Sequence, residues 1–260
     1  MHFTDQLQNA IFLPEKPKRI ISLVPSQTEL LIDLGLENEV IGITKFCIHP
    51  KETVKSKTKV GGTKNFNFEI IDQLQPDLII GNKEENYREG IEKLQEKYPV
   101  WMSDIFTLQD SLAMIKSIGE ITGTAENAIE ITKKIADRFA GLKAPETKIP
   151  AAYFIWKNPY MAAGNNTFIN DMLQRCGFEN VFAGAGRYPE ITIEMLQKIK
   201  PKVVLLSSEP YPFKEKHLQE FREMLPEAKI KIVDGEMFSW YGSRILKAPP
   251  YFQKLLAEFQ

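Results

Sequence analysis

The sequence predicts an α/β fold with two lobes, in which each lobe has a mainly parallel central sheet flanked by helices and one long helix joins the two. Three observations lead to this fold class. Short apolar runs alternate with amphipathic runs in both halves of the 260-residue chain, a central stretch is helical in pattern, and a helix–proline–strand pattern occurs twice. The predicted parts are a first lobe over 1–106, a linking region over 107–146 and a second lobe over 147–260.

The chain opens with a strand, a helix and a second strand. Residues 19–24 form a short apolar run that ends before Pro25, as expected of a buried strand. A helix is predicted to follow, because Ser26 is a favourable N-cap and Glu29, three positions later, completes a capping-box pattern. Residues 40–44 are apolar again, so this order predicts a parallel βαβ unit.

The remainder of the first lobe repeats this alternation. Residues 69–74 have a helical pattern that Pro76 ends, and residues 77–81 form the third strand, which is expected to be buried. Residues 86–97 are amphipathic and predict a helix, and residues 99–102 form another strand.

The linking region contains the predicted long helix. Thr124 is placed to cap this helix, and apolar side chains spaced by three or four residues continue to about Leu142. A helix of about 19 residues is roughly 28 Å long at 1.5 Å per residue, which is enough to cross a domain boundary.

The second lobe returns to alternating strands and helices. The predicted strands are 151–156, 203–206 and 230–233, and the predicted helices are 167–176, 191–199, 217–224 and a last one after Arg244. Residues 69–80 also resemble residues 194–205. Each of these segments has a glutamate in the first turn of a short helix, a proline break at the same distance and a hydrophobic strand, which indicates two similar lobes.

Composition excludes several classes of function. The formal net charge of -1 predicts neither nucleic acid nor an anionic membrane surface as a partner. No apolar run approaches the roughly 18 residues of a membrane span. Polar residues from Asp5 onward interrupt every apolar run at the amino terminus, so we expect either a cytoplasmic protein or a mature form, and Met1 favours the former. Cys47 and Cys176 are expected to be two free thiols, although one bridge between them is an alternative.

Several motifs together resemble one protein family. Residues 19–30, Gly61-Gly62, the segment 69–80, Asn158-Pro159-Tyr160 and the stretch 176–182 resemble, in order and spacing, the helical-backbone substrate-binding proteins of ABC importers for siderophores, haem and vitamin B12. The second-lobe motifs are most similar to the cobalamin binders. The resemblance covers the chain from about Phe3 to the last helix and implies a non-enzymatic receptor that holds a corrinoid, haem or ferric chelate between its lobes and has no intrinsic cofactor.

The same resemblance implies a partner. In this family one glutamate on each lobe meets arginines of the permease, and by position these glutamates are Glu69 and Glu194. A carboxylate in the first turn of a helix is favoured by the helix dipole and stays available to an arginine. The alternative is that both glutamates only stabilise their helices. We expect the protein to be a monomer.

In a two-lobed receptor, loops at the carboxyl ends of the parallel strands line the ligand cleft. Aromatic side chains there suit a flat macrocycle, cationic ones suit carboxylates or an anionic chelate, and a histidine is a potential axial ligand of cobalt or iron. The predicted ligand-binding residues are Phe46, His49, Lys64, Asn82, Lys83, Tyr160, Arg187, Tyr188, Tyr211, Trp240, Tyr241 and Arg244. About half of the aromatic residues are alternatively explained as covers of strand ends.

Two tryptophans are not assigned to this site, and three of its positions differ from the cobalamin binders. Trp101 and Trp156 lie in or beside strand runs and are assigned to packing. Thr63 and Asn82 stand where the cobalamin binders have tryptophans, and Tyr188 stands where they have a third, so the first-lobe side of the cleft is expected to be more polar.

Metal and enzyme functions are less favoured by the sequence. Cys47 and His49 lie two positions apart, but no second cluster of cysteine and histidine accompanies them, so no protein-held metal is predicted. The chain has no phosphate-binding loop, no dinucleotide-binding glycine motif and no nucleophile elbow. The rival interpretation is a cytoplasmic enzyme, or a cofactor-handling or sensory protein, built on the same two-lobed fold.

Overall fold

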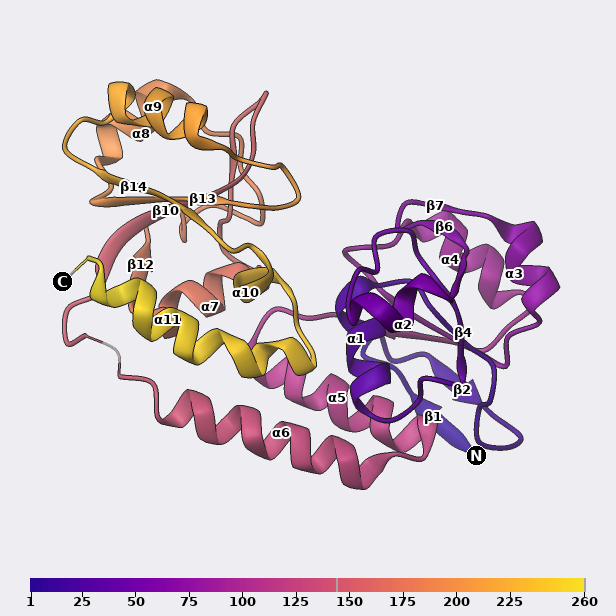
Figure 1. Ribbon diagram of the computed structural model, residues 1–260. Helices are drawn as coiled ribbons and strands as arrows, with labels where there is room; N and C mark the ends of the chain where they lie inside the picture. Colours follow the sequence, from indigo (N-terminus) through magenta and orange to yellow (C-terminus); the bar gives the residue numbers. More distant parts are fainter. Residues whose placement is uncertain (144, 260) are drawn as a thin grey trace. The chain divides into compact units, whose positions relative to one another are not determined.

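The computed structural model describes residues 1–143 and 145–259. The chain divides into two compact units, which are described separately here. Unit 1 comprises Met1–Ile105, Gln109–Ile135 and Tyr241–Arg244, and unit 2 comprises Phe106–Leu108, Ala136–Trp240 and Ile245–Gln260 (Figure 1).

Unit 1 is built on a parallel five-stranded sheet. Its strands are β3 (Ile20–Ser22), β4 (Val40–Ile43), β5 (Thr58–Lys59), β8 (Leu78–Asn82) and β9 (Val100–Ser103), in the spatial order β5-β4-β3-β8-β9. All residues of β3, β8 and β9 are buried, as expected of strands covered on both faces of a sheet. Two hairpins lie outside this sheet: β1 (His2–Thr4) with β2 (Ala10–Phe12), and β6 (Gly61–Gly62) with β7 (Asn65–Phe66).

Four helices connect the strands of unit 1. They are α1 (Pro25–Asp33), α2 (Lys51–Lys55), α3 (Phe68–Leu74) and α4 (Arg88–Gln95). Ile71 of α3 and Leu94 of α4 pack with Ile21 and Ile79 of the strands in one buried apolar cluster. This cluster holds both helices on the sheet and fixes where the loops at its carboxyl edge begin.

The predicted capping box at the start of α1 is wrong. The helix begins two residues earlier than predicted, with Pro25 as its first residue and Val24 as the N-cap. Proline is favoured at this place because its missing N–H would be unsatisfied anyway. Ser26 therefore lies inside the helix, and Glu29 bonds to Arg244 instead of capping the helix.

Two consecutive helices occupy the predicted linking region. They are α5 (Leu108–Thr122) and α6 (Ala125–Ala140). Helix α6 corresponds to the predicted long helix, whereas α5 was not predicted as a separate helix. The boundary between the two units falls within α6, after Ile135.

Unit 2 contains a second five-stranded sheet. Its strands are β10 (Ile149–Trp156), β11 (Met161–Ala162), β12 (Phe178–Asn180), β13 (Val203–Ser207) and β14 (Lys229–Val233). The order is β11-β10-β13-β14, with β12 also paired to β10. Only β11 is antiparallel among these described strands, so this sheet is also mainly parallel.

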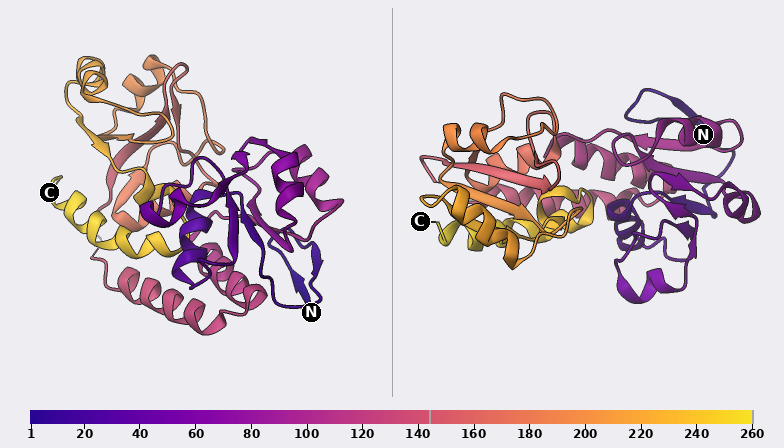
Figure 2. Two further views of the ribbon diagram at one scale, coloured as in Figure 1. Left: turned by 45° about the vertical axis from the view of Figure 1, so that its right-hand side comes forward. Right: turned by 90° about the horizontal axis from the view of Figure 1, so that it is seen from above.

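Helices cover both faces of the unit 2 sheet. Helices α8 (Ile193–Ile199) and α9 (Glu215–Met224) lie on one face, and α7 (Phe168–Cys176), α10 (Glu236–Ser239) and α11 (Ala248–Ala257) lie on the other (Figures 1 and 2). A 3-10 helix, η1 (Ser243–Lys247), precedes α11. The predicted α/β fold class with two mainly parallel sheets is confirmed.

Three further sequence features have direct structural outcomes. Cys47 and Cys176 are both free and buried, as expected. Gly177 ends α7 with a φ of 105°, a left-handed conformation that glycine adopts without strain. Within the described residues, no helix combines the length and hydrophobicity that crossing a membrane requires.

Candidate binding and docking sites

The repeated segment of the sequence has the same local structure in both units. Asn67 caps α3 by accepting the Ile70 N–H at 3.1 Å, and Thr192 caps α8 by accepting the Met195 N–H at 3.2 Å. Each helix ends at a residue in the left-handed conformation, Gln75 or Lys200, with φ of 43° and 51°. A proline follows directly in each case and leads into β8 or β13.

Glu69 and Glu194 occupy the same position in these two helices. Each is exposed and lies in the first turn, directly after the first helical residue. Hydrogen bonds from its own backbone N–H and from Thr192 lower the pKa of Glu194, so this side chain is held in the charged form. On α8 the side chains on either side, Ile193 and Met195, are 41% and 43% exposed.

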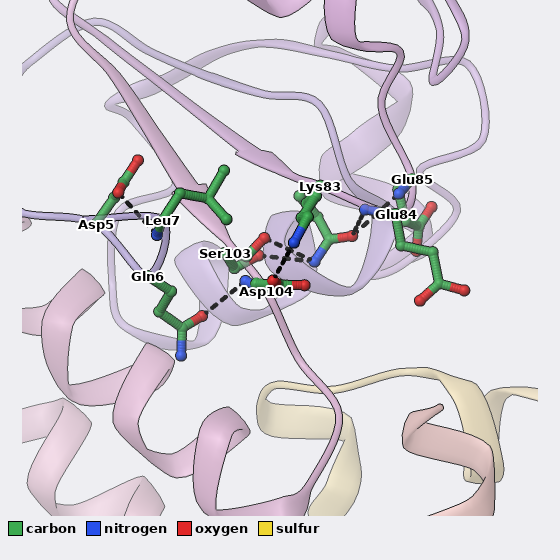
Figure 3. Close-up of polar contacts among 9 residues, drawn as sticks. Asp5, Gln6, Leu7, Lys83, Glu84, Glu85, Ser103 and Asp104 are labelled. Atoms are coloured by element: carbon green, nitrogen blue, oxygen red, sulfur yellow. Dashed lines mark hydrogen bonds and ion pairs between the residues drawn. The ribbon is translucent and has the colours of Figure 1, made fainter. Parts of the chain in front are cut away.

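A buried amide organises the carboxyl edge of the unit 1 sheet. The Asn82 side-chain oxygen accepts the backbone N–H groups of Glu84 at 2.8 Å and Glu85 at 3.0 Å. These two donors fix the orientation of the amide, so its nitrogen points to Ser103 and donates to the Ser103 carbonyl and hydroxyl oxygens (Figure 3). The Ser103 hydroxyl in turn donates to the Gly81 carbonyl at 3.1 Å. Asn82 thus has a structural role, with its polar atoms bonded to the protein itself.

The two predicted lysines of this edge are also bonded. Lys83 forms an ion pair with Asp104 at 2.7 Å, while the Asp104 backbone N–H donates to the Gln6 side chain at 3.1 Å (Figure 3). The Lys64 ammonium donates to the carbonyl oxygens of Glu84 at 2.6 Å and Asn86 at 3.3 Å. Lys64, Asn82 and Lys83 therefore belong to one polar cluster that stabilises the loop after β8.

Phe46 and His49 lie in the loop after β4. Phe46 is 50% exposed, lies against Gly62 and has the Lys45 ammonium 5.1 Å from its ring centroid. His49 is partly exposed. Between them the Cys47 thiol is buried beside the Thr28 and Thr44 hydroxyls, and burial raises its pKa. No described group of three His, Cys, Asp or Glu residues is arranged to hold a metal ion.

Tyr241 and Arg244 are buried in unit 1. The Arg244 guanidinium forms a two-pronged bond with the Glu29 carboxylate, at 2.6 and 2.7 Å, and each side chain is only 7% exposed. The Gly242 N–H between them donates to the Ser111 hydroxyl at 3.3 Å. This pairing gives Arg244 a structural role against α1.

In unit 2, Tyr160 and Tyr211 belong to an aromatic cluster. The Tyr160 ring centroid lies 5.3 Å from that of Phe221, and the Tyr211 ring centroid lies 5.6 Å from that of Trp156. Both tyrosines pack against the buried core, as the alternative of strand-end covers predicts. Trp101 is buried as assigned, but Trp156 is 40% exposed and presents an aromatic surface that the assignment to packing missed.

Arg187 and Tyr188 lie in a loop that is held to the segment after β11. The Gly164 N–H donates to the Arg187 carbonyl at 2.6 Å, and the Arg187 N–H donates to the Asn165 carbonyl at 2.8 Å. The Arg187 guanidinium lies 6.0 Å from the Tyr188 ring centroid and is exposed, whereas Tyr188 is partly exposed. Backbone bonds thus position both side chains.

Trp240 has a partner that the sequence analysis did not select. Its indole N–H donates to a Glu209 carboxylate oxygen at 2.7 Å, and the Ser239 hydroxyl donates to the same oxygen at 2.9 Å. Glu209 lies two residues after the end of β13, at the carboxyl edge of the sheet. The signal was present in the sequence, because a charged residue just past a buried strand is a candidate for this edge.

Comparisons with known proteins identify the family. A family model described as periplasmic binding protein matches residues 20–228. The chain belongs to the periplasmic binding protein family. This confirms the resemblance of the sequence motifs and the prediction of a non-enzymatic binding protein.

Individual relatives support the same assignment. The vitamin B12-binding protein of Vibrio parahaemolyticus is 28% identical over 198 residues, which span 74% of this chain and 72% of that protein. The haem-binding protein HutB of Vibrio cholerae matches with a TM-score of 0.79 at 22% identity, over 92% of this chain and 98% of its own. An ABC-type Fe3+-hydroxamate transport protein from Saccharomonospora viridis matches with a TM-score of 0.78 at 20% identity, over 98% of each chain. At these identities the two structures establish the fold.

Proposed function

We propose that this protein binds a metal chelate or corrinoid and delivers it to an ABC importer. The match of residues 20–228 to the periplasmic binding protein family carries this proposal. The names of the relatives support the ligand class, because they include binders or transporters of vitamin B12, haem and ferric hydroxamate. These three ligands share a metal within a large organic chelate, so the proposal extends to that class.

The proposed contacts divide into exposed groups and supporting groups. Phe46, Trp156, Arg187 and Tyr188 have exposed or partly exposed side chains that suit direct contact with a chelate. Asn82, Lys83 and Arg244 are bonded to the protein, and we assign them to the support of the loops that carry the contacts. The remaining candidates stay proposed contacts: His49, Lys64, Tyr160, Tyr211, Trp240 and Tyr241.

The first experiment is a ligand panel. Purified protein is incubated with cobalamin, cobinamide, haem and several ferric siderophores, and thermal unfolding and absorbance are recorded. A ligand present at a hundred times its dissociation constant adds about 2.7 kcal/mol to the free energy of unfolding, so one chelate should raise the melting temperature clearly. If no chelate shifts the transition, while a known receptor responds to the same panel, the proposed function is wrong.

We also propose that Glu69 and Glu194 dock on the permease. Both are exposed carboxylates at equivalent helix positions, and carboxylates are suited to arginine partners. Glu69→Gln with Glu194→Gln should abolish ligand import by the reconstituted importer but leave ligand affinity unchanged. Glu190→Gln, an exposed glutamate outside both helices, is the matched control. Unimpaired import by the double variant would contradict the docking role.

A further inference from the structure

Glu209 is held rigidly at the carboxyl edge of the unit 2 sheet. Its backbone N–H donates to the hydroxyl of Ser207, which is the last residue of β13. Its side-chain oxygen Oε1 accepts bonds from the Ser239 hydroxyl and the Trp240 indole N–H, at 2.9 and 2.7 Å. Two donors on one oxygen fix the carboxylate plane, so the second oxygen has a defined position.

The second oxygen of Glu209 remains available. Within the described residues, Oε2 forms no hydrogen bond or ion pair and is not among the buried atoms that lack a partner. It therefore reaches the surface. Because Glu209 is only partly exposed, a hydrogen bond to this oxygen is shielded more from water than one to a surface carboxylate.

The charges that face Glu209 are negative. Asp234, after β14, and Glu236, on α10, both act to raise its pKa, in addition to the larger effect of burial. The described residues provide no basic side chain within ion-pair distance of Glu209. A carboxylate in such surroundings favours a hydrogen-bond donor or a positive charge and repels another carboxylate.

The equivalent edge of unit 1 is charge-compensated. When Pro76 and Pro201 are matched, Glu209 corresponds to Glu84 and Ser208 corresponds to Lys83. Lys83 neutralises Asp104 after the neighbouring strand, whereas the Ser208 hydroxyl accepts the Gly235 N–H at 3.0 Å. Unit 2 thus has a serine where unit 1 has the lysine that pairs with Asp104, and this positive charge is absent beside Glu209.

We propose that Glu209 is a specificity-determining residue that selects chelates with N–H or O–H donors on their periphery and disfavours chelates that carry carboxylates. This inference rests on the proposed function and narrows its ligand class. An amide-bearing corrinoid meets the requirement, because each primary amide supplies N–H donors without negative charge. A chelate with peripheral carboxylates places like charges together at this edge.

The test uses a matched pair of ligands and a matched pair of variants. The ligands are a corrinoid whose side chains end in amides and the same macrocycle with carboxylic acids in their place. Glu209→Gln keeps an oxygen that Ser239 and Trp240 can still donate to, but removes the charge. Glu227→Gln is the control variant and also removes one negative charge. Glu227 is exposed and precedes β14, so it lies at the amino end of that strand, whereas Glu209 lies at the carboxyl edge of the sheet.

The expected result is a change in the ratio of the two affinities. The wild-type protein and Glu227→Gln should bind the amide form at least about tenfold more tightly, since hydrogen bonds to charged groups contribute roughly 1.5–3 kcal/mol. Glu209→Gln should bring the ratio toward one. Wild-type affinity for the amide form should also weaken as the pH falls, starting above the ordinary glutamate pKa of 4.5, and this loss should be absent in Glu209→Gln.

The possible failures are distinguishable. If Glu209→Gln leaves the ratio and the pH profile unchanged, or if the wild-type protein prefers the carboxylate form or haem, the role of Glu209 is overturned while the receptor function stands. If the wild-type protein binds neither corrinoid nor any other chelate of the panel, the proposed function fails, and the inference fails with it.

Discussion

Unit 1 and unit 2 share a backbone segment but use different side-chain chemistry at its end. In both, a capped seven-residue helix ends at a left-handed residue, and a proline leads into a buried five-residue strand. After the strand, unit 1 has an amide network with an ion pair, whereas unit 2 has a serine and the carboxylate of Glu209. The common part depends on local backbone rules, and the different part depends on what each edge must bind or support.

The equivalence extends to the last residue of each strand. The Asn82 side chain accepts the N–H of Glu84, and the Ser207 hydroxyl accepts the N–H of Glu209, which lies at the corresponding position. The serine does this over a longer distance, 3.4 Å against 2.8 Å, because its side chain is shorter and it also accepts a bond from the Tyr153 hydroxyl. Both edges therefore bond the backbone N–H that lies two residues past the strand, but the hydrogen bond in unit 2 is longer than the one in unit 1.

The largest expected difference between the units concerns their ion pairs. Arg244→Met should lower the free energy of unfolding by about 3–5 kcal/mol, because it removes the two charge-assisted bonds that the guanidinium donates to the buried Glu29 carboxylate. In unit 2, Lys157 pairs with Glu220, whose side chain is 39% exposed, so Lys157→Met should cost less than about 1 kcal/mol. Urea unfolding measures both variants.

A third variant separates pairing from packing. Glu29→Met with Arg244→Met removes both charges, so part of the lost stability should return relative to Arg244→Met alone. Equal losses for Arg244→Met and Lys157→Met would show that burial does not distinguish the two pairs.

The next largest difference concerns the residues that organise the two edges. Asn82→Ala should cost about 2–3 kcal/mol, because it removes the acceptor of the Glu84 and Glu85 N–H groups and the two bonds that the amide donates to Ser103. Ser207→Ala should cost less, about 1–2 kcal/mol, because the bond of its hydroxyl to the Glu209 N–H is long, although its bonds to the Glu209 carbonyl and the Tyr153 hydroxyl are also lost. Hydrogen exchange of the β8 and β13 amides locates each effect in its own unit. A larger loss for Ser207→Ala would reverse the proposed order of strength.

Local patterns allowed most of the fold to be predicted. The buried strands β8 and β13, the prolines before them and the end of α7 at Gly177 all depend on neighbours in sequence. The capping box at Ser26 was wrong because Glu29 has a stronger partner 215 residues later, which no local pattern reveals. The short strands β5, β11 and β12 were also missed, because strands this short carry little periodicity.

The candidate site was less predictable for the same reason. The loops at the carboxyl edges were identified, but residue type alone did not distinguish exposed side chains from bonded ones. Arg244 was expected to contact an anionic ligand, yet its guanidinium is used by Glu29. Glu209 lies in a loop that was identified, but its partner Trp240 is 31 residues away, so its hydrogen bonding could not be predicted. Such pairings depend on tertiary structure and leave no local pattern in the sequence.

The smallest expected difference tests the equivalence itself. Asn67→Ala and Thr192→Ala each remove a side-chain oxygen that accepts one N–H in the first turn of α3 or α8, and each should cost about 1 kcal/mol. Because the caps have the same geometry, the two losses should agree within about 0.5 kcal/mol, which is the usual limit of additivity between independent sites. The measurement is urea unfolding of each single variant and of the double variant, whose loss should equal the sum. A clear inequality would mean that one of the helices gains its stability from tertiary packing instead of its cap, and the two segments would then share a shape without sharing the forces that maintain it.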